Sequence, residues 1–186
     1  MELFDLPVIW AFIIGFGIIM YVLMDGFDLG VGILFPFAPD EESRDTMMNS
    51  VAPVWDGNET WLVLGGAGLL AAFPLVYSIF LPALYIGVFL LLAGLIFRGV
   101  AFEFRFKARS SRYLWNWAFA GGSTVASFAQ GAVVGAYIQG FETANGVYVG
   151  GALDWLTPFT VLTGLGMLVG YALLGCLLYT SPSPRD

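Results

Sequence analysis

The sequence contains no histidine and only one cysteine, Cys176. Without histidine, the chain lacks the commonest ligand of protein metal sites and the usual axial ligand of haem. A single cysteine excludes a disulfide within the chain. The sequence also has no glycine-rich phosphate loop and no nucleophile elbow. If the protein takes part in redox chemistry, another chain must therefore hold the metal.

Charge is scarce as well. Charged residues make up 11% of the 186 residues, whereas 59% are hydrophobic and 17% are aromatic. This composition lies far outside the range of soluble domains, and the long apolar runs lack the period-two alternation of barrel strands. We predict an all-α integral membrane protein, a polytopic helical bundle of about five transmembrane helices in contact with lipid. The net charge of -7 argues against a nucleic-acid partner.

Five apolar stretches are long enough to cross a bilayer, which needs about 20 residues. The stretch from Trp61 to Phe97 has no charge and is too long for one span, so we place a turn between Pro74 and Pro82. The expected spans are residues 7–37, 50–73, 81–104, 113–140 and 155–178. The N-terminus has no basic region or cleavage site, so we expect the first span to be retained. Residues 1–178 form the predicted bundle, and residues 179–186 form a tail that we expect to be disordered.

Basic residues gather in two of the expected loops. The first loop contains Arg44, and the third loop with its flanks contains Arg98, Arg105, Lys107, Arg109 and Arg112. Cytoplasmic loops of membrane proteins carry an excess of lysine and arginine. We therefore predict that both loops face the cytoplasm, with the N-terminus outside and the C-terminal end of this chain inside.

Four acidic residues interrupt the first two spans. They are Asp25, Asp28, Asp56 and Glu59. Asp25 and Asp28 are spaced i, i+3, as are Asp56 and Glu59, so the two members of each pair share one helix face. Under the predicted topology the four acids collect on the cytoplasmic side with Arg98 and Glu103 of the third span, next to Trp55. Four carboxyl groups beside one or two arginines cannot all be ionised cheaply in a poorly hydrated site, so some should hold protons.

Two interpretations of these acids stay open. The dipole of the second helix would stabilise Asp56 near its N-terminus, and Asp25 and Asp28 could sit among lipid headgroups. However, Asp56 would lie about 9 Å inside a helix that begins at Ser50, beyond its first turn. We therefore predict a proton relay made of the four acids and open to the cytoplasm, in which Arg98 lowers the cost of buried negative charge.

Three segments carry a resemblance to a known family. They are MDGFDLGVGILFPF (24–37), MMNSVAPVWDGNETWLV (47–63) and FRGVAFEFRFK (97–107). They resemble subunit II of the cytochrome bd-type quinol oxidases, and the first and third are similar to the cyanide-insensitive branch. That family comprises bacterial terminal oxidases of the respiratory chain, which oxidise quinol and reduce oxygen to water. The resemblance implies a location in the bacterial cytoplasmic (inner) membrane.

In that family the b-type and d-type haems and the quinol-oxidising loop belong to subunit I. The resemblance therefore implies a haem-bearing partner subunit and no cofactor held by this chain's own ligands. It places the acids of the GFD and WDG motifs, here Asp28 and Asp56, on a proton route from the cytoplasm, and Asp25 is carried over with them. In some members subunit II also holds a structural quinone, and the sequence leaves open whether this one does.

The family's subunit II is nearly twice as long, so the chain resembles its N-terminal half. We expect a truncated form that is inactive alone. Two other functions stay open on the residues themselves. A proton-coupled transporter would also use buried carboxylates and glycine-rich helices, but it predicts internal repeats. In a structural scaffold the acids would only pair with Arg98, and neutralising Asp56 would harm assembly rather than turnover.

Overall fold

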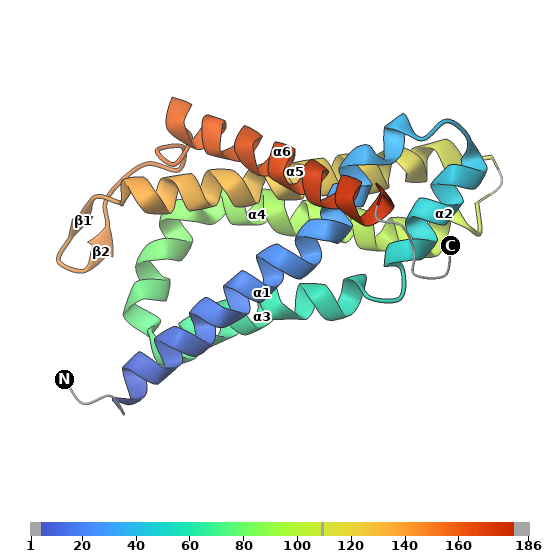
Figure 1. The fold of residues 1–186 in the computed structure, drawn as a ribbon. Coiled ribbons are helices and arrows are strands. Elements are labelled where there is room, and N and C mark those ends of the chain that lie inside the picture. Colours follow the sequence, from blue (N-terminus) through green and yellow to red (C-terminus); the bar gives the residue numbers. More distant parts are fainter. Residues whose placement is uncertain (1–4, 109, 181–186) are drawn as a thin grey trace.

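The computed structural model describes residues 5–108 and 110–180. Five long helices form a bundle, with a shorter helix at one end and a small hairpin at the other (Figure 1). The long helices are α1 (Leu6–Leu34), α3 (Trp55–Ala72), α4 (Pro74–Arg105), α5 (Arg112–Gln139) and α6 (Pro158–Thr180). The predicted all-α membrane class is confirmed. Residues 181–186, which belong to the tail expected to be disordered, lie outside the described residues.

Each of the five expected spans overlaps one long helix. Among the described residues, three segments are long and apolar enough to cross a membrane, namely residues 6–37, 74–105 and 158–178. Helix α3 has only 18 residues and opens with the polar segment WDGNET. Helix α5 includes serine, threonine, asparagine and glutamine among its 28 residues. The count of five membrane spans therefore stays a prediction.

The boundaries around α3 differ from the sequence prediction. Helix α3 begins at Trp55 and not at Ser50, because a separate helix and a turn occupy the preceding residues. The predicted turn between Pro74 and Pro82 is wrong, since α4 begins at Pro74 and only Phe73 separates it from α3. Proline suits the first position of a helix because its missing N–H is not needed there. Pro82 lies inside α4, which changes direction near its start (Figure 1).

Helix α2 (Glu41–Val51) lies in a segment that we expected to be a loop. The side chain of Asp40 caps this helix by accepting a hydrogen bond from the backbone N–H of Ser43 at 2.8 Å. Acidic residues in its first turn suit the positive end of the helix dipole. The helix lies at the end of the bundle where α4 ends and α5 begins (Figure 1).

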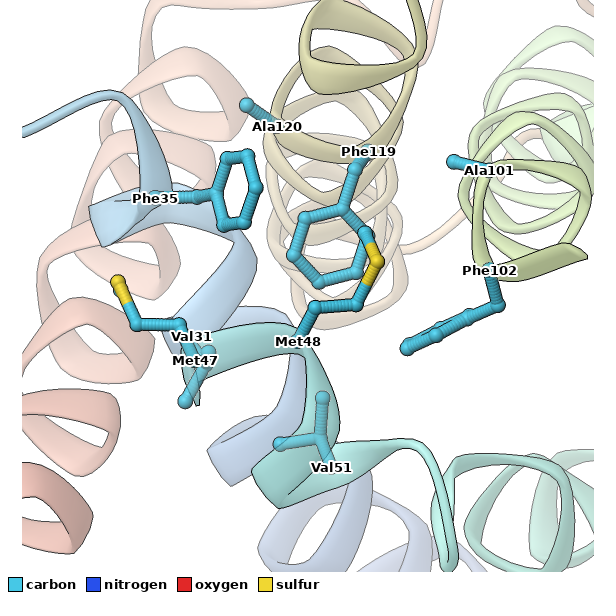
Figure 2. Close-up of a cluster of buried hydrophobic side chains, with 9 residues drawn as sticks. All are labelled: Val31, Phe35, Met47, Met48, Val51, Ala101, Phe102, Phe119 and Ala120. Atoms are coloured by element: carbon cyan, nitrogen blue, oxygen red, sulfur yellow. The ribbon is translucent and has the colours of Figure 1, made fainter. Parts of the chain in front are cut away.

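An apolar cluster anchors α2 to the bundle (Figure 2). Its buried members come from α1, α2, α4, α5 and the short 3-10 helix η1 (Phe35–Phe37). They are Val31, Phe35, Met47, Met48, Val51, Ala101, Phe102, Phe119 and Ala120. The rings of Phe35 and Phe119 meet edge to face, with centroids 4.9 Å apart. The basic segment between α4 and α5 therefore lies at the same end of the bundle as α2.

The opposite end of the bundle holds a hairpin and the start of α1 (Figure 1). Strands β1 (Thr143–Ala144) and β2 (Val147–Tyr148) are antiparallel. Asn145 and Gly146 connect them with positive φ angles of 52° and 75°, as a tight hairpin turn requires. Helix α2, which carries Arg44, and the basic connection between α4 and α5 therefore share the end of the bundle away from the hairpin, as predicted. The side of the membrane that this end faces stays a prediction.

Glycines bring helix backbones into close contact, and two of these contacts lie near the buried ionisable residues. A Cβ atom on Gly94 of α4 would lie 2.7 Å from the carbonyl oxygen of Gly122 on α5. Between α1 and α6, a Cβ atom on Gly30 would lie 2.7 Å from the backbone nitrogen of Gly175. Small residues permit such close approach between membrane helices. These contacts hold α4, which carries Arg98, against α5, and hold α6 against α1, which carries Asp25 and Asp28.

Candidate functional site

The side chain of Arg98 is fully buried and lies among three carboxyl groups. Its Nη1 donates a hydrogen bond to Oδ1 of Asp25 at 2.7 Å and lies 3.4 Å from Oε1 of Glu59. Its Nη2 lies 3.8 Å from Oδ2 of Asp28, which accepts a hydrogen bond from Nδ2 of Asn58 at 2.7 Å. We call these five residues the acid cluster. Helices α1, α3 and α4 each contribute to it.

The acid cluster combines deep burial with an excess of acid groups. Asp25 and Asp28 are 0% and 2% exposed, and the side chain of Glu59 is 20% exposed. Full ionisation would leave three negative charges against the one guanidinium of Arg98, which is costly inside a membrane. A site with more carboxyl groups than cations is suited to holding and exchanging protons. The convergence of Asp25, Asp28, Glu59 and Arg98 matches the sequence prediction.

Asp56 lies elsewhere than expected within its helix. Because α3 begins at Trp55, Asp56 falls in the first turn of the helix and is exposed. Asp56 does not lie beyond the first turn, where we predicted it, and the helix dipole stabilises a carboxylate at its actual position. Asp56 still precedes Glu59 by three residues on the same helix, so it lies next to the acid cluster on its exposed side.

Besides Arg98, we expected Glu103 and Trp55 to support the site, and the structure gives these two residues different surroundings. Glu103 is exposed and its carboxylate accepts a hydrogen bond from Nζ of Lys107 at 2.7 Å, so it lies outside the acid cluster. Trp55 is half-buried and stacks on Phe102 with ring centroids 4.9 Å apart. A Cβ atom on Gly99 would lie 3.3 Å from the Trp55 ring. Trp55 therefore packs between α3 and α4, close to Arg98.

A second ionic group, which we did not predict, holds α2 against α4 and α5. Arg105 is fully buried, and its Nη1 donates to Asp45 at 2.5 Å and its Nη2 to Glu41 at 3.0 Å. Its Nε donates to Oδ1 of Asn116 at 2.5 Å, and Arg112 also donates to Asp45. We call these five residues the α2 clamp. The i, i+4 spacing of Glu41 and Asp45 opposite the basic loop was the signal that could have revealed it.

The α2 clamp predicts a dependence of stability on pH. Partial burial alone would raise the pKa of Asp45, but hydrogen bonds from Arg112 and Arg105 hold the pKa below its usual value. Such a group stabilises the folded state above its unfolded pKa of about 4, and the contribution is lost as the pH falls through the folded pKa. We expect the Tm of the protein in mild detergent to drop at acid pH, and to drop less in Asp45→Asn.

Because Asp45 is partly exposed, solvent screening should limit its effect. At neutral pH the free energies of unfolding of Asp45→Asn and the unsubstituted protein should differ by about 1 kcal/mol or less. The measurement is thermal unfolding between about pH 7 and about pH 3, where the carboxyl groups titrate. Glu42→Gln is the matched control, because Glu42 is exposed on the same helix and takes part in no ion pair among the described residues. Identical pH curves for Asp45→Asn and the unsubstituted protein would contradict the prediction.

The outer surfaces of the long helices are strongly apolar. Phe12 on α1, Ile96 on α4 and Val169 on α6 are 75%, 65% and 71% exposed. Such surfaces are unfavourable in water and favourable against lipid or another membrane subunit. Together with the three apolar spans, they support a protein embedded in a membrane.

The chain has few side chains that could ligate a metal. Within residues 5–108 and 110–180, no three or more cysteine, aspartate and glutamate side chains are grouped to hold a metal ion. Cys176 is exposed on α6, and Met47 and Met48 pack inside the apolar cluster (Figure 2). That the chain holds no haem, as its lack of histidine leads us to expect, stays a prediction. Whether a structural quinone binds to the chain stays a prediction.

Comparison with known proteins gives a consistent set of matches. Residues 6–182 match the family model described as cytochrome bd terminal oxidase subunit II. The chain is 37% identical to cytochrome bd-I ubiquinol oxidase subunit 2 of Escherichia coli (strain K12) over 172 residues, which cover 87% of this chain and 45% of that protein.

Two further relatives agree. The chain is 34% identical over 189 aligned residues to the probable cytochrome oxidase subunit 2 of Haemophilus influenzae, covering 96% of this chain and 50% of that protein. It is 30% identical over 161 residues to cytochrome bd ubiquinol oxidase subunit 2 of Bacillus subtilis, covering 84% of this chain and 48% of that protein. The chain thus spans about half the length of the curated relatives it matches.

Proposed function

Since this chain belongs to the cytochrome bd terminal oxidase subunit II family, we propose that it acts as a haem-free subunit of a bacterial quinol oxidase. In this proposal a partner subunit carries the b-type and d-type haems and oxidises quinol, and the complex lies in the cytoplasmic membrane. Reduction of oxygen to water consumes protons, and this chain supplies a path for them from the cytoplasm. The observation that carries the proposal is the buried acid cluster around Arg98.

The exposure of the acids suggests the order in which they would handle a proton. Asp56 is exposed at the start of α3, and Glu59 follows on the same face with its side chain 20% exposed. Asp28 and Asp25 are buried behind them on α1. A proton taken up at Asp56 or Glu59 would therefore pass inward to the two aspartates. Exposure falls at each of these steps.

Arg98 has a distinct role in this path. It lies within 3.8 Å of a carboxylate oxygen of each of three acids, Asp25, Asp28 and Glu59. Whichever of the three gives up its proton, the guanidinium is close enough to stabilise the negative charge that remains. Arg98 stays protonated throughout, because the pKa of an arginine lies far above physiological pH. It is therefore a fixed counter-charge for the relay and does not itself carry protons.

Asp28→Asn tests the relay in the full-length subunit assembled with its haem-bearing partner. The amide keeps the size of the carboxyl group and an acceptor for Asn58, but it cannot release a proton. We expect the rate of quinol-driven oxygen consumption to fall by about 100-fold. This is the lower end of the range of rate enhancements that a positioned proton-transfer group provides. An oxygen electrode measures this rate, and a reduced-minus-oxidised absorbance spectrum measures the haem content of the same preparation.

Glu103→Gln is the matched control, because it neutralises an exposed acid of α4 outside the acid cluster. Full turnover in Asp28→Asn would contradict the relay. Full turnover in Asp56→Asn would remove only Asp56 and leave Glu59 as the point of entry. The relay predicts that Asp28→Asn loses turnover but keeps its bound haem. If the acids serve only as a scaffold through the same ion pairs, Asp28→Asn should lose bound haem. Family membership favours the oxidase over the transporter.

A further inference from the structure

A second group of polar atoms adjoins the acid cluster. Four buried side chains each have an oxygen atom without a hydrogen-bond partner among the described residues. These atoms are the hydroxyl oxygens of Tyr21 and Tyr171, Oδ2 of Asp25 and Oε1 of Gln130. The four residues come from α1, α5 and α6 and are between 0% and 6% exposed. Buried polar atoms in folded proteins almost always have a partner, which can be ordered water.

The four side chains lie close to one another. Tyr21 precedes Asp25 by one helical turn on α1, so the two side chains lie on the same face of that helix. Tyr171 belongs to one buried cluster with Leu29 of α1 and with Ala126 and Ala129 of α5, so it lies between the helices that carry Asp25 and Gln130. The Tyr171 ring lies against Gly26, where a Cβ atom would be 2.7 Å from its Cε1. The missing side chain at Gly26 thus gives Tyr171 its place beside Asp25.

The donors and acceptors of this group are balanced. Two phenol hydroxyls can donate, and Oδ2 of Asp25 and Oε1 of Gln130 can accept. However, none of these four oxygen atoms makes a direct hydrogen bond by distance and angle within the described structure. Neighbouring polar groups that do not bond directly are commonly bridged by water, and a buried water typically needs two to four polar partners. Here four partners are available from three helices.

We propose that Tyr21, Asp25, Gln130 and Tyr171 bind ordered water between α1, α5 and α6. Oδ1 of Asp25 is bonded to Arg98, so the water would contact the other oxygen, Oδ2. The role of this water rests on the proposed proton relay. It would accept the proton that Asp25 releases at Oδ2 and return one to it, so the exchange needs no other reactant. Tyr171 and Gln130 are positioning residues because they act through the water.

The test uses the full-length subunit in its oxidase complex and two measurements that do not depend on turnover. The first is a high-resolution cryo-electron microscopy map, in which we expect water density about 3 Å from Oδ2 of Asp25. Tyr171→Phe should lose this density, because it keeps the ring against Gly26 and removes only the hydroxyl. The second is the infrared absorption of the Asp25 carboxyl group, as carboxylic acid or carboxylate, identified by its absence in Asp25→Asn. This band should shift in Tyr171→Phe.

Tyr137→Phe is the matched control, since Tyr137 is 59% exposed on α5 and lies against the ring of Phe80. It should leave both the water density and the infrared band unchanged. If Tyr171→Phe does not assemble, Gln130→Met provides the same test from α5. A map in which the four side chains bond directly without water, or an unshifted band, would overturn the proposal. Failure of the relay itself would appear separately, as full turnover in Asp28→Asn.

Discussion

Arg98→Met is expected to destabilise the protein by about 3–5 kcal/mol, the usual cost of removing one partner from a buried ion pair. Methionine fills most of the space of arginine but offers no charge and no donor. Asp25 and Asp28, both buried, would lose the cation that lies 2.7 Å and 3.8 Å from their oxygen atoms. The free energy of unfolding in mild detergent, followed by helical circular dichroism, measures the effect.

Two variants show whether the loss comes from the unpaired acids. Arg44→Met removes an ion pair at the surface, in which the side chains of Arg44 and Glu41 are 25% and 45% exposed. It should lower the free energy of unfolding by about 1 kcal/mol or less. Adding Asp25→Asn to Arg98→Met removes one orphaned charge and should recover part of the lost stability. Equal stability of Arg98→Met and Arg44→Met would show that the acid cluster does not depend on its arginine.

Gly122→Ala is expected to lower stability by about 3 kcal/mol, near the upper end of the usual cost of overpacking. A Cβ atom at this position would lie 2.5 Å from the carbonyl oxygen of Gly94 and 2.9 Å from the backbone nitrogen of Arg98. Backbone atoms cannot rotate away as the end of a side chain can, so α4 and α5 would have to separate. The shift would also move Arg98 relative to Asp25.

The neighbouring glycine provides the control for this prediction. A Cβ atom on Gly121 would meet no described atom within 4 Å. Alanine is a better helix former than glycine by about 1 kcal/mol, so Gly121→Ala should leave stability unchanged or raise it slightly. Thermal unfolding of the two variants side by side measures the difference. A Tm for Gly122→Ala as high as that for Gly121→Ala would contradict close packing of α4 on α5.

The long helices could be predicted because their apolar runs carry the signal directly, whereas α2 could not be recognised by the same rule. Its sequence EESRDTMMNSV is polar on average, and its helix depends on the Asp40 cap and on packing of its methionines against other helices. The turn assigned to Pro74 and Pro82 failed for another reason. Proline is a strong breaker in water, but at the first position of α4 it is well suited to a helix.

The acids of the candidate site were predictable in part. The i, i+3 spacing and the expected topology brought Asp25, Asp28 and Glu59 toward Arg98, as the structure has them. Asn58 was not predicted, because asparagine in an apolar span does not reveal which helix it will face. Tyr171 was missed because its place beside Asp25 depends on how α6 packs on α1, and this packing depends on two helix backbones meeting at glycines.

The ion pair between Asp25 and Arg98 joins residues that are 73 positions apart in the chain. During synthesis, α1 therefore emerges from the ribosome well before its counter-ion exists. An unpaired aspartate at the centre of a membrane helix costs about 2.5–3.5 kcal/mol on insertion scales. The apolar residues of α1 offset this cost in part, and protonation of the acids or the arrival of α4 would lower it further. Biogenesis of the subunit is thus coupled to the order in which its helices are made.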